Sequence, residues 1–149
     1  MRKLMMVLAV AVMACCGCTI MPSGAEYTYE QVPPTFTADD ASGLVYFMRE
    51  SALAAGGEGW FINEDGNPIG LQASGTYFMH KAVAGEHVYS VGDSAISAIS
   101  IDIKAMQTYY ILSWADVGLI TRTYKLKEIP RSIAEKALPK LKYIRMIIE

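Results

Sequence analysis

The sequence predicts a mainly β protein, an antiparallel β-sandwich of about seven strands with a short C-terminal helix. Three observations support this fold class. Residues 99–103 alternate strictly between isoleucine and a polar residue, which is typical of a strand with one buried face. Asp65-Gly66 lies between two apolar runs and indicates a two-residue hairpin turn. Short runs rich in β-branched and aromatic residues recur between turn residues, as expected for a sandwich.

Residues 1–17 are predicted to be a secretion signal and not part of the fold. Arg2 and Lys3 precede an unbroken apolar run at residues 4–14. This run has the length of a signal-peptide core and is too short for a membrane-spanning helix, which needs about 20 apolar residues.

All three cysteines, at positions 15, 16 and 18, follow the apolar run directly. The stretch resembles a bacterial lipoprotein signal, in which a small residue precedes a cysteine that is acylated and becomes the mature amino terminus. Gly17 meets the small-residue requirement for Cys18, which is the predicted lipid-attachment residue. Cys15 is the alternative, because Val12 lies three places before it.

Two other interpretations of these cysteines are weaker. A redox pair formed by Cys15 and Cys18 has suitable spacing but lies in a signal segment and not at a helix start in a βαβ unit. The second interpretation is a secreted protein whose signal peptide is cleaved at another site, without lipid attachment. No cysteine follows residue 18, so the folded part has no internal disulfide, cysteine nucleophile or thiolate metal ligand.

The residue after the attachment site predicts the location. Thr19 stands where an aspartate would resemble an inner-membrane retention signal. We therefore expect a protein of the bacterial cell envelope that carries palmitate or a similar lipid. It is expected to be anchored in the outer membrane and to face the periplasm.

Residues 18–42 are predicted to be the acylated cysteine and an extended tether. Three prolines and scattered small polar residues interrupt any helix or strand period there. An arm that lies on the domain is the alternative, because Tyr27, Tyr29 and Phe36 have the apolar surface to fill pockets.

The sandwich domain is predicted over residues 43–129. Pro68 indicates an edge strand or a strand start. The expected strands, in chain order, lie at residues 44–48, 60–62, 68–71, 75–79, 86–91, 99–103, 107–114 and 119–129.

Residues 130–149 are predicted to be a helical segment. Ser132 and Glu135 have the spacing of a capping box at the start of a helix that reaches residue 138. Pro139 either ends this helix or begins a second one. Leu141, Ile144 and Ile148 then share one helical face, which we expect to pack on the sandwich.

Several short motifs occur in a characteristic order. They are Gly-Leu-Val-Tyr-Phe at 43–47 with Arg49, Asp-Gly-Asn-Pro-Ile-Gly at 65–70, Gly-Thr-Tyr-Phe at 75–78, Ala-Gly-Glu-His at 84–87 and Gln-Thr-Tyr-Tyr at 107–110. Over roughly residues 40 to 129 the chain thereby resembles bacterial lipoproteins of the domain-of-unknown-function 2846 family. Met48 and Ala84 depart from its usual aromatic and proline. The resemblance implies a membrane-anchored all-β domain without established activity and without catalytic residues.

The two histidines, His80 and His87, flank the turn predicted at Ala84-Gly85. With Glu86 they offer ligands for zinc or copper, but the spacing matches no established ligand motif. Hydrogen-bonded or solvated histidines are therefore the favoured interpretation. No nucleophile–base pair and no glycine-rich phosphate motif is recognisable. The sequence therefore predicts no catalytic residue, no cofactor and no enzyme.

The charge distribution is uneven along the chain. The formal net charge of −2 excludes a general nucleic-acid binder. Residues 26–116 hold twelve acids and three bases, whereas residues 117–149 hold eight bases and three acids. The favoured interpretation is a solvated face that balances the acidic body. The functional alternative is a basic surface for anionic lipid head groups, a cell-wall polymer or an acidic partner. The predicted contact residues are Lys136, Lys140, Lys142 and Arg145.

These observations predict a non-enzymatic envelope lipoprotein that acts as a binding or structural module. Its expected partners are the membrane, through the lipid, and an envelope protein or cell-wall component. The alternative is a periplasmic module that binds a small ligand or a carbohydrate. That alternative predicts aromatic side chains exposed in a concave site. For the binding or structural module, Trp60, Tyr77 and Trp114 would add to a contact surface if exposed, although core packing is the commoner fate of such residues.

Overall fold

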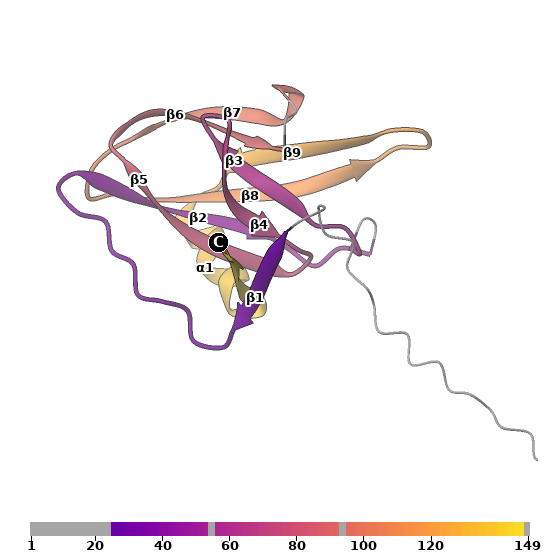
Figure 1. Ribbon diagram of the computed structural model, residues 1–149, viewed down its shortest axis with the longest axis horizontal. Helices are drawn as coiled ribbons and strands as arrows, with labels where there is room; N and C mark the ends of the chain where they lie inside the picture. The colour runs from indigo at the N-terminus through magenta and orange to yellow at the C-terminus, as the bar shows by residue number, and fades with distance from the viewer. Residues whose placement is uncertain (1–24, 54–55, 93–94, 148–149) are drawn as a thin grey trace, which may run out of the picture.

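The computed structural model describes residues 25–53, 56–92 and 95–147, which form two β-sheets (Figure 1). The larger sheet has six strands in the order β1-β10-β5-β2-β8-β9, and the smaller has four in the order β4-β3-β6-β7. The strands are β1 (Glu26–Glu30), β2 (Ser42–Arg49), β3 (Trp60–Glu64), β4 (Asn67–Gln72), β5 (Thr76–Val83), β6 (Gly85–Val91), β7 (Ala98–Ile103), β8 (Thr108–Val117), β9 (Arg122–Glu128) and β10 (Lys142–Ile147). The helical elements are η1 (Ala95–Ser97), α1 (Arg131–Ala137) and η2 (Leu138–Lys140).

The hydrophobic core lies between the two sheets. Phe47 and Phe78 of the larger sheet stack with 5.0 Å between ring centroids. Tyr89 of the smaller sheet meets Phe47 edge-on at 5.1 Å, and all three side chains are buried. Aromatic pairs in such geometries add stability beyond the area they bury. The predicted mainly β, sandwich-like fold is confirmed.

The local signals for strands and turns are confirmed where they were strongest. Ile101 and Ile103 of the alternating segment are buried, and Ile99 packs against the core. Asp65 and Gly66 connect β3 to β4 and have positive φ angles of 50° and 83°. A two-residue turn with positive φ at both positions is the conformation that the Asp-Gly pair predicts.

The described residues form ten strands, more than the predicted number of about seven. Eight of them overlap the expected strand ranges, and two lie where no strand was expected. β1 lies within the predicted tether, and β10 replaces the helix predicted beyond Pro139. The two strands pair with each other antiparallel, Glu26 opposite Ile147. The backbone groups of β1 and β10 hydrogen-bond to each other. This pairing joins segments far apart in the chain, so the local sequence of neither segment predicts it.

Two pairings in the larger sheet are parallel, so this sheet is mixed. β2 runs parallel to β8, and β10 runs parallel to β5. The remaining strand pairings described in the two sheets are antiparallel. The prediction of antiparallel strands therefore holds for most of the fold.

The short helix α1 lies on the outer face of the larger sheet (Figure 1). Its buried residues Ala134 and Ala137 pack with Met48 of β2 and Tyr110 of β8. The predicted Ser132 cap does not form, because the cap position lies two residues earlier, at Pro130, and Ser132 is inside the helix.

Candidate binding site

A pocket of about 400 Å³ lies where β1, β5 and β10 meet. Its lining combines aromatic, charged and aliphatic side chains: Tyr29, Glu30, Gln31, Pro33, Tyr77, Leu141, Lys142 and Tyr143. We call it the tyrosine pocket.

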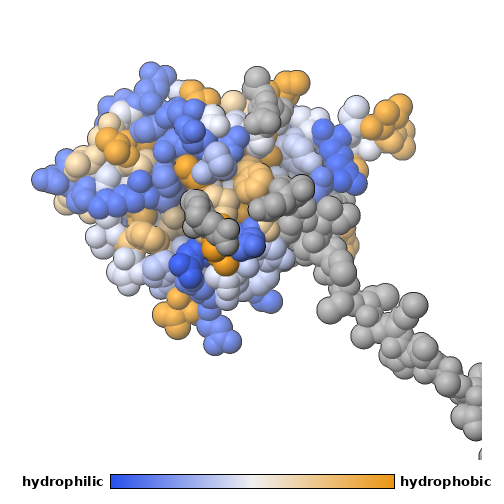
Figure 2. Space-filling model, in the orientation of Figure 1, coloured by the Kyte–Doolittle hydropathy of each residue, from blue (hydrophilic) through white to orange (hydrophobic). Residues whose placement is uncertain are grey.

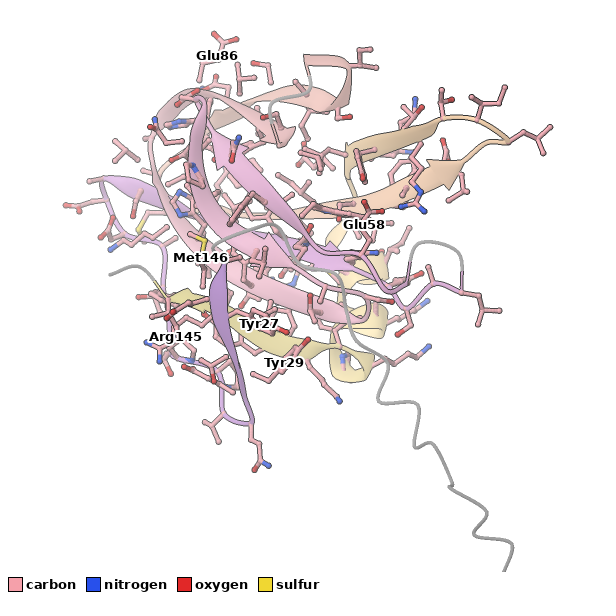
Figure 3. The ribbon with its side chains drawn as sticks, turned by 45° about the vertical axis from the view of Figure 1, so that its right-hand side comes forward. Tyr27, Tyr29, Glu58, Glu86, Arg145 and Met146 are labelled. Atoms are coloured by element: carbon pink, nitrogen blue, oxygen red, sulfur yellow. The ribbon has the colours of Figure 1, made fainter. Side chains whose placement is uncertain are left out.

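The strand register brings three of these residues side by side. Glu30 of β1 lies opposite Tyr143 of β10, and Tyr143 lies opposite Tyr77 of β5. Directly paired residues point to the same face of a sheet. Tyr29 stands at the edge and is 47% exposed. In Figure 3, Tyr29 and Arg145 lie on the same side of the molecule, on β1 and β10.

The pocket is the open end of a row of tyrosines that crosses four strands. The centroids of successive rings, from Tyr143 to Tyr77, Tyr46 and Tyr110, are 5.4, 6.3 and 5.1 Å apart. Tyr110 at the other end is buried among residues that pack with α1. The row therefore gives the pocket an ordered aromatic wall before any ligand binds.

The lining tyrosines retain unused hydrogen-bonding capacity. Among the described residues, no group bonds to the hydroxyls of Tyr29, Tyr77 or Tyr143. Burial raises the pKa of all three, and a neighbouring tyrosine or Glu30 raises it further. The phenols therefore stay protonated at neutral pH and can both donate and accept hydrogen bonds.

The charged groups at the pocket differ in availability. Oε1 of Glu30 forms an ion pair with Nε of Arg145 at 2.6 Å. Lys142 is exposed and has no ion pair within the part of the chain that the structure describes. The site thus offers aromatic faces, free hydroxyls and one available ammonium group.

The predicted basic residues lie on two adjacent elements. Lys136 and Lys140 belong to α1 and η2, whereas Lys142 and Arg145 belong to β10, and all four are exposed. Arg145 is neutralised by Glu30. Within residues 25–53, 56–92 and 95–147 the three lysines have no ion-pair partner. Lys142 joins this basic surface to the tyrosine pocket.

The aromatic residues singled out from the sequence have different surroundings. Trp60 is buried, and its ring lies 3.5 Å below the guanidinium of Arg49. Tyr77 lines the tyrosine pocket, and Trp114 is partly exposed on β8. Tyr29 and Tyr143 were not identified as site residues, although the alternation in Glu-Tyr-Thr-Tyr-Glu at residues 26–30 is a strand signal.

The histidines His80 and His87 converge on one carboxylate between the sheets. Nε2 of His80 lies 3.0 Å from Oε2 of Glu64, and Nδ1 of His87 lies 3.5 Å from Oε1. The hydroxyl of Tyr89, which lies opposite Glu64 in the strand register, donates to the same Oε1 at 2.8 Å. We call these four residues the Glu64 cluster.

The carboxylate expected beside the histidines is a different one from that observed. Glu86 accepts a hydrogen bond from Ser100 at 2.9 Å and lies at the outer edge of the molecule (Figure 3). Within the described residues, no group of three or more His, Cys, Asp or Glu side chains is arranged to hold a metal ion. Both ring nitrogens of His87 face oxygen acceptors, 2.8 Å from Asp65 Oδ2 and 2.8 Å from the Val83 carbonyl.

These contacts favour the protonated form of His87. Burial lowers its pKa, but the hydrogen bonds to Val83 and Asp65 and the charge of Glu64 outweigh burial and raise it above 6.5. The stability that protonation adds is complete below about pH 6.5, the unfolded value. It is lost as the pH rises through the folded-state pKa.

We therefore expect His87→Gln to cost most stability at acidic pH. Urea denaturation between about pH 5.5 and 8.5 should give a difference in unfolding free energy, wild type minus variant, that shrinks with rising pH. His80→Gln serves as the comparison because it changes the other imidazole of the cluster. A difference for His87→Gln that is constant across this range contradicts the assignment.

The predicted lipid-attachment residues, Cys18 and its alternative Cys15, lie outside the described residues. Within residues 25–53, 56–92 and 95–147, no helix combines the length and apolar character needed for a membrane crossing. The similarity to domain-of-unknown-function 2846 lipoproteins stays a prediction. Comparisons of the chain with protein-family models, curated proteins and solved structures return no match.

Proposed function

We propose that this protein is a membrane-anchored, non-enzymatic module of the bacterial envelope that binds a saccharide in the tyrosine pocket. The observation that supports this most directly is the set of three tyrosine hydroxyls around a 400 Å³ pocket that have no hydrogen-bond partner among the described residues. Binding pockets for small ligands have volumes of about 300–1,000 Å³ and combine apolar walls with a few polar groups.

The chemistry of the lining favours a sugar ring. Aromatic side chains cover the apolar C–H face of such a ring, and phenols also exchange hydrogen bonds with its hydroxyls. Tyr143 is buried and packs against Tyr77 at 70°, so the aromatic surface accessible to a ligand comes from Tyr77 and the exposed Tyr29. A flat aromatic ligand would use the walls but leave most of the hydroxyls without partners.

The neighbouring charges favour an acidic saccharide. Lys136, Lys140 and Lys142 carry charges that no described acid neutralises, and Lys142 stands at the pocket itself. Carboxylate or phosphate groups on a cell-wall or outer-membrane polymer would complement these ammonium groups. The ligand class proposed is therefore an anionic envelope oligosaccharide.

The lipid anchor forms the second part of the proposal. Acylation at Cys18 would hold the domain at the outer membrane, on its periplasmic side, where such polymers occur. Each buried methylene of an acyl chain adds about 0.8 kcal/mol to membrane affinity, so several chains hold a protein stably. A purely structural module, or one that binds an acidic envelope protein through its lysines, is the competing function.

Tyr29→Ala is expected to weaken saccharide binding by about tenfold, because it removes an exposed wall and one hydroxyl. Titration of the protein with acidic peptidoglycan oligosaccharides and with their neutral counterparts, followed by NMR or calorimetry, measures this change. Lys142→Gln should weaken binding of the acidic sugars but not that of their neutral counterparts.

Val32→Ala is the matched control for these variants. Val32 is exposed in the same segment but does not line the pocket, so its removal should leave affinity unchanged. Undiminished binding by Tyr29→Ala, or no binding of either saccharide by the wild type, would contradict the proposed ligand site and favour the structural role.

A further inference from the structure

The β8–β9 hairpin extends beyond the rest of the larger sheet. Pairing of β8 with β2 ends at Leu112, whereas pairing of β8 with β9 continues to Val117 opposite Arg122. At about 3.3 Å per residue, the five residues after Leu112 extend about 16 Å past that point. Figure 1 shows this projection, with the turn at its far end.

The turn of the hairpin is apolar, which is unusual for a turn. Gly118 N–H donates to the carbonyl of Thr121 at 2.9 Å and closes it. Leu119 and Ile120, between these residues, are 106% and 96% exposed, and Val117 beside them is 48% exposed. Turns ordinarily carry Gly, Pro, Asn, Asp or Ser. In Figure 2 the end of the hairpin is hydrophobic and adjoins hydrophilic surface.

The two side chains at the tip contribute little to the fold. Residues that are fully exposed lose no water on folding, so neither packing nor burial explains their apolar character. Leu119 and Ile120 are therefore available to bury against another surface.

A basic and aromatic collar lies behind the tip. Lys125 lies in the projecting part of β9 and Lys127 at its base, opposite Leu112, and neither forms an ion pair within the described part of the chain. Trp114 lies opposite Lys125 and donates Nε1–H to Asp116 at 3.1 Å. Asp116 is the single acid between residues 113 and 127, against three bases.

Arg122, the third base, connects the hairpin to the rest of the domain through Glu58. Nη1 of Arg122 is 2.6 Å from Oε2 of Glu58, whose other oxygen accepts from Tyr124 at 2.9 Å. These contacts hold the hairpin in its projecting direction, as seen in Figure 3, where Glu58 lies at the base of the hairpin.

We propose that this hairpin is a membrane-contact element that inserts Leu119 and Ile120 into an anionic lipid bilayer. The tip is convex and small, whereas a stable protein interface buries about 800 Å² on each partner over a complementary surface. A fluid bilayer needs no such complementarity. Tryptophan at the level of the head groups and lysines beside anionic lipids are the usual companions of an inserted apolar tip.

This inference goes beyond the proposed saccharide site, and the two sites are compatible. β9 and β1 are the opposite edges of the larger sheet, and the tyrosine pocket lies at the β1 edge. A domain that touches the membrane through the hairpin therefore leaves the pocket open to a ligand. The contact also does not require that Cys18 is the acylated residue.

The test places a fluorescent reporter at the tip. The full chain carrying Leu119→Trp is reconstituted into phosphatidylglycerol-containing vesicles whose acyl chains carry bromine. Val83→Trp is the matched control, because Val83 is also exposed but lies opposite Ser42, at the end of the sheet where β2 begins and away from the hairpin. Fluorescence of each variant is compared with that of the wild type, which contains Trp60 and Trp114.

We expect the tryptophan introduced by Leu119→Trp to show a blue shift and a loss of fluorescence with brominated lipid, and little quenching by aqueous iodide. The tryptophan of Val83→Trp should show no blue shift, no loss of fluorescence with brominated lipid and strong quenching by aqueous iodide. Iodide quenching of both variants to the same extent overturns the proposal. Protection of the tip from both quenchers also overturns it, because a second copy of the chain would then cover the hairpin. Saccharide affinity is measured separately, so the two proposals fail independently.

Discussion

Replacing Cys18 by alanine is expected to abolish lipid attachment and to release most of the protein from the membrane fraction. Acylation of a lipoprotein-type signal requires the cysteine sulfur, so no other residue at position 18 can substitute. Without the acyl chains the domain loses about 0.8 kcal/mol of membrane affinity for each methylene that had been buried. Labelling with palmitate, followed by separation of membrane and soluble fractions, measures both effects.

Cys15→Ala and Cys16→Ala are the controls for this experiment, because they remove neighbouring sulfurs from the same segment. Both variants should keep the label. Label retained on Cys18→Ala and lost on Cys15→Ala would move the attachment site to the alternative residue. Label on none of the four proteins, the wild type included, would indicate a secreted protein cut at another site.

Replacing Glu64 by alanine is expected to lower the free energy of unfolding at neutral pH by about 2–4 kcal/mol. The substitution leaves the buried Tyr89 hydroxyl without its acceptor and removes the carboxylate that His80 and His87 share. A buried polar group that loses its partner costs about 1–3 kcal/mol, and bonds to a charged group exceed those to a neutral one. Urea denaturation monitored by fluorescence measures the change.

Glu86→Ala is the matched control, since Glu86 bonds an exposed serine at the surface and should change stability by less than about 0.5 kcal/mol. Addition of Tyr89→Phe to Glu64→Ala tests the mechanism. If the Glu64→Ala variant loses stability because the Tyr89 hydroxyl has no acceptor, the double variant is more stable than the sum of the two single effects predicts. Additive effects would show that the hydrogen bond contributes little.

Much of the sandwich is predictable because its signals are local. The alternating isoleucines at residues 99–103 place one face toward the core, and Asp65-Gly66 supplies the positive φ angles of a tight hairpin. Each signal depends on a few adjacent side chains, and each is confirmed. The number of strands is less predictable, because β1 and β10 become strands through mutual pairing.

The C-terminal segment illustrates that limit. Leu141, Ile144 and Ile148 have helical spacing, but Tyr143 and Ile144 also suit a strand. The choice is made by the edge of β5, which offers its backbone to Lys142 and Tyr143. Unpaired backbone groups are costly when buried, so an available sheet edge outweighs a weak local preference.

In the candidate sites, too, some residues are identifiable from the sequence and others only from the strand pairing. Lys142 and Tyr77 were identified from residue type and charge, whereas Tyr29 and Tyr143 join them only because β1 and β10 pair beside β5. The approach of His80 to His87 follows from the turn between them. Their shared carboxylate is Glu64 and not Glu86, because Glu64 enters from another strand.

The sequence by itself determined the predominance of strands, the two-residue turn and the contrast between an acidic body and a basic end. It also supplies the grounds for expecting a lipid at Cys18. Only the tertiary structure decided which tyrosines form a pocket, which carboxylate serves the histidines and which hairpin projects from the sheet. The physical reason is that side-chain alternation and turn geometry are properties of neighbouring residues, whereas a site is assembled by strand pairing between segments far apart in the chain.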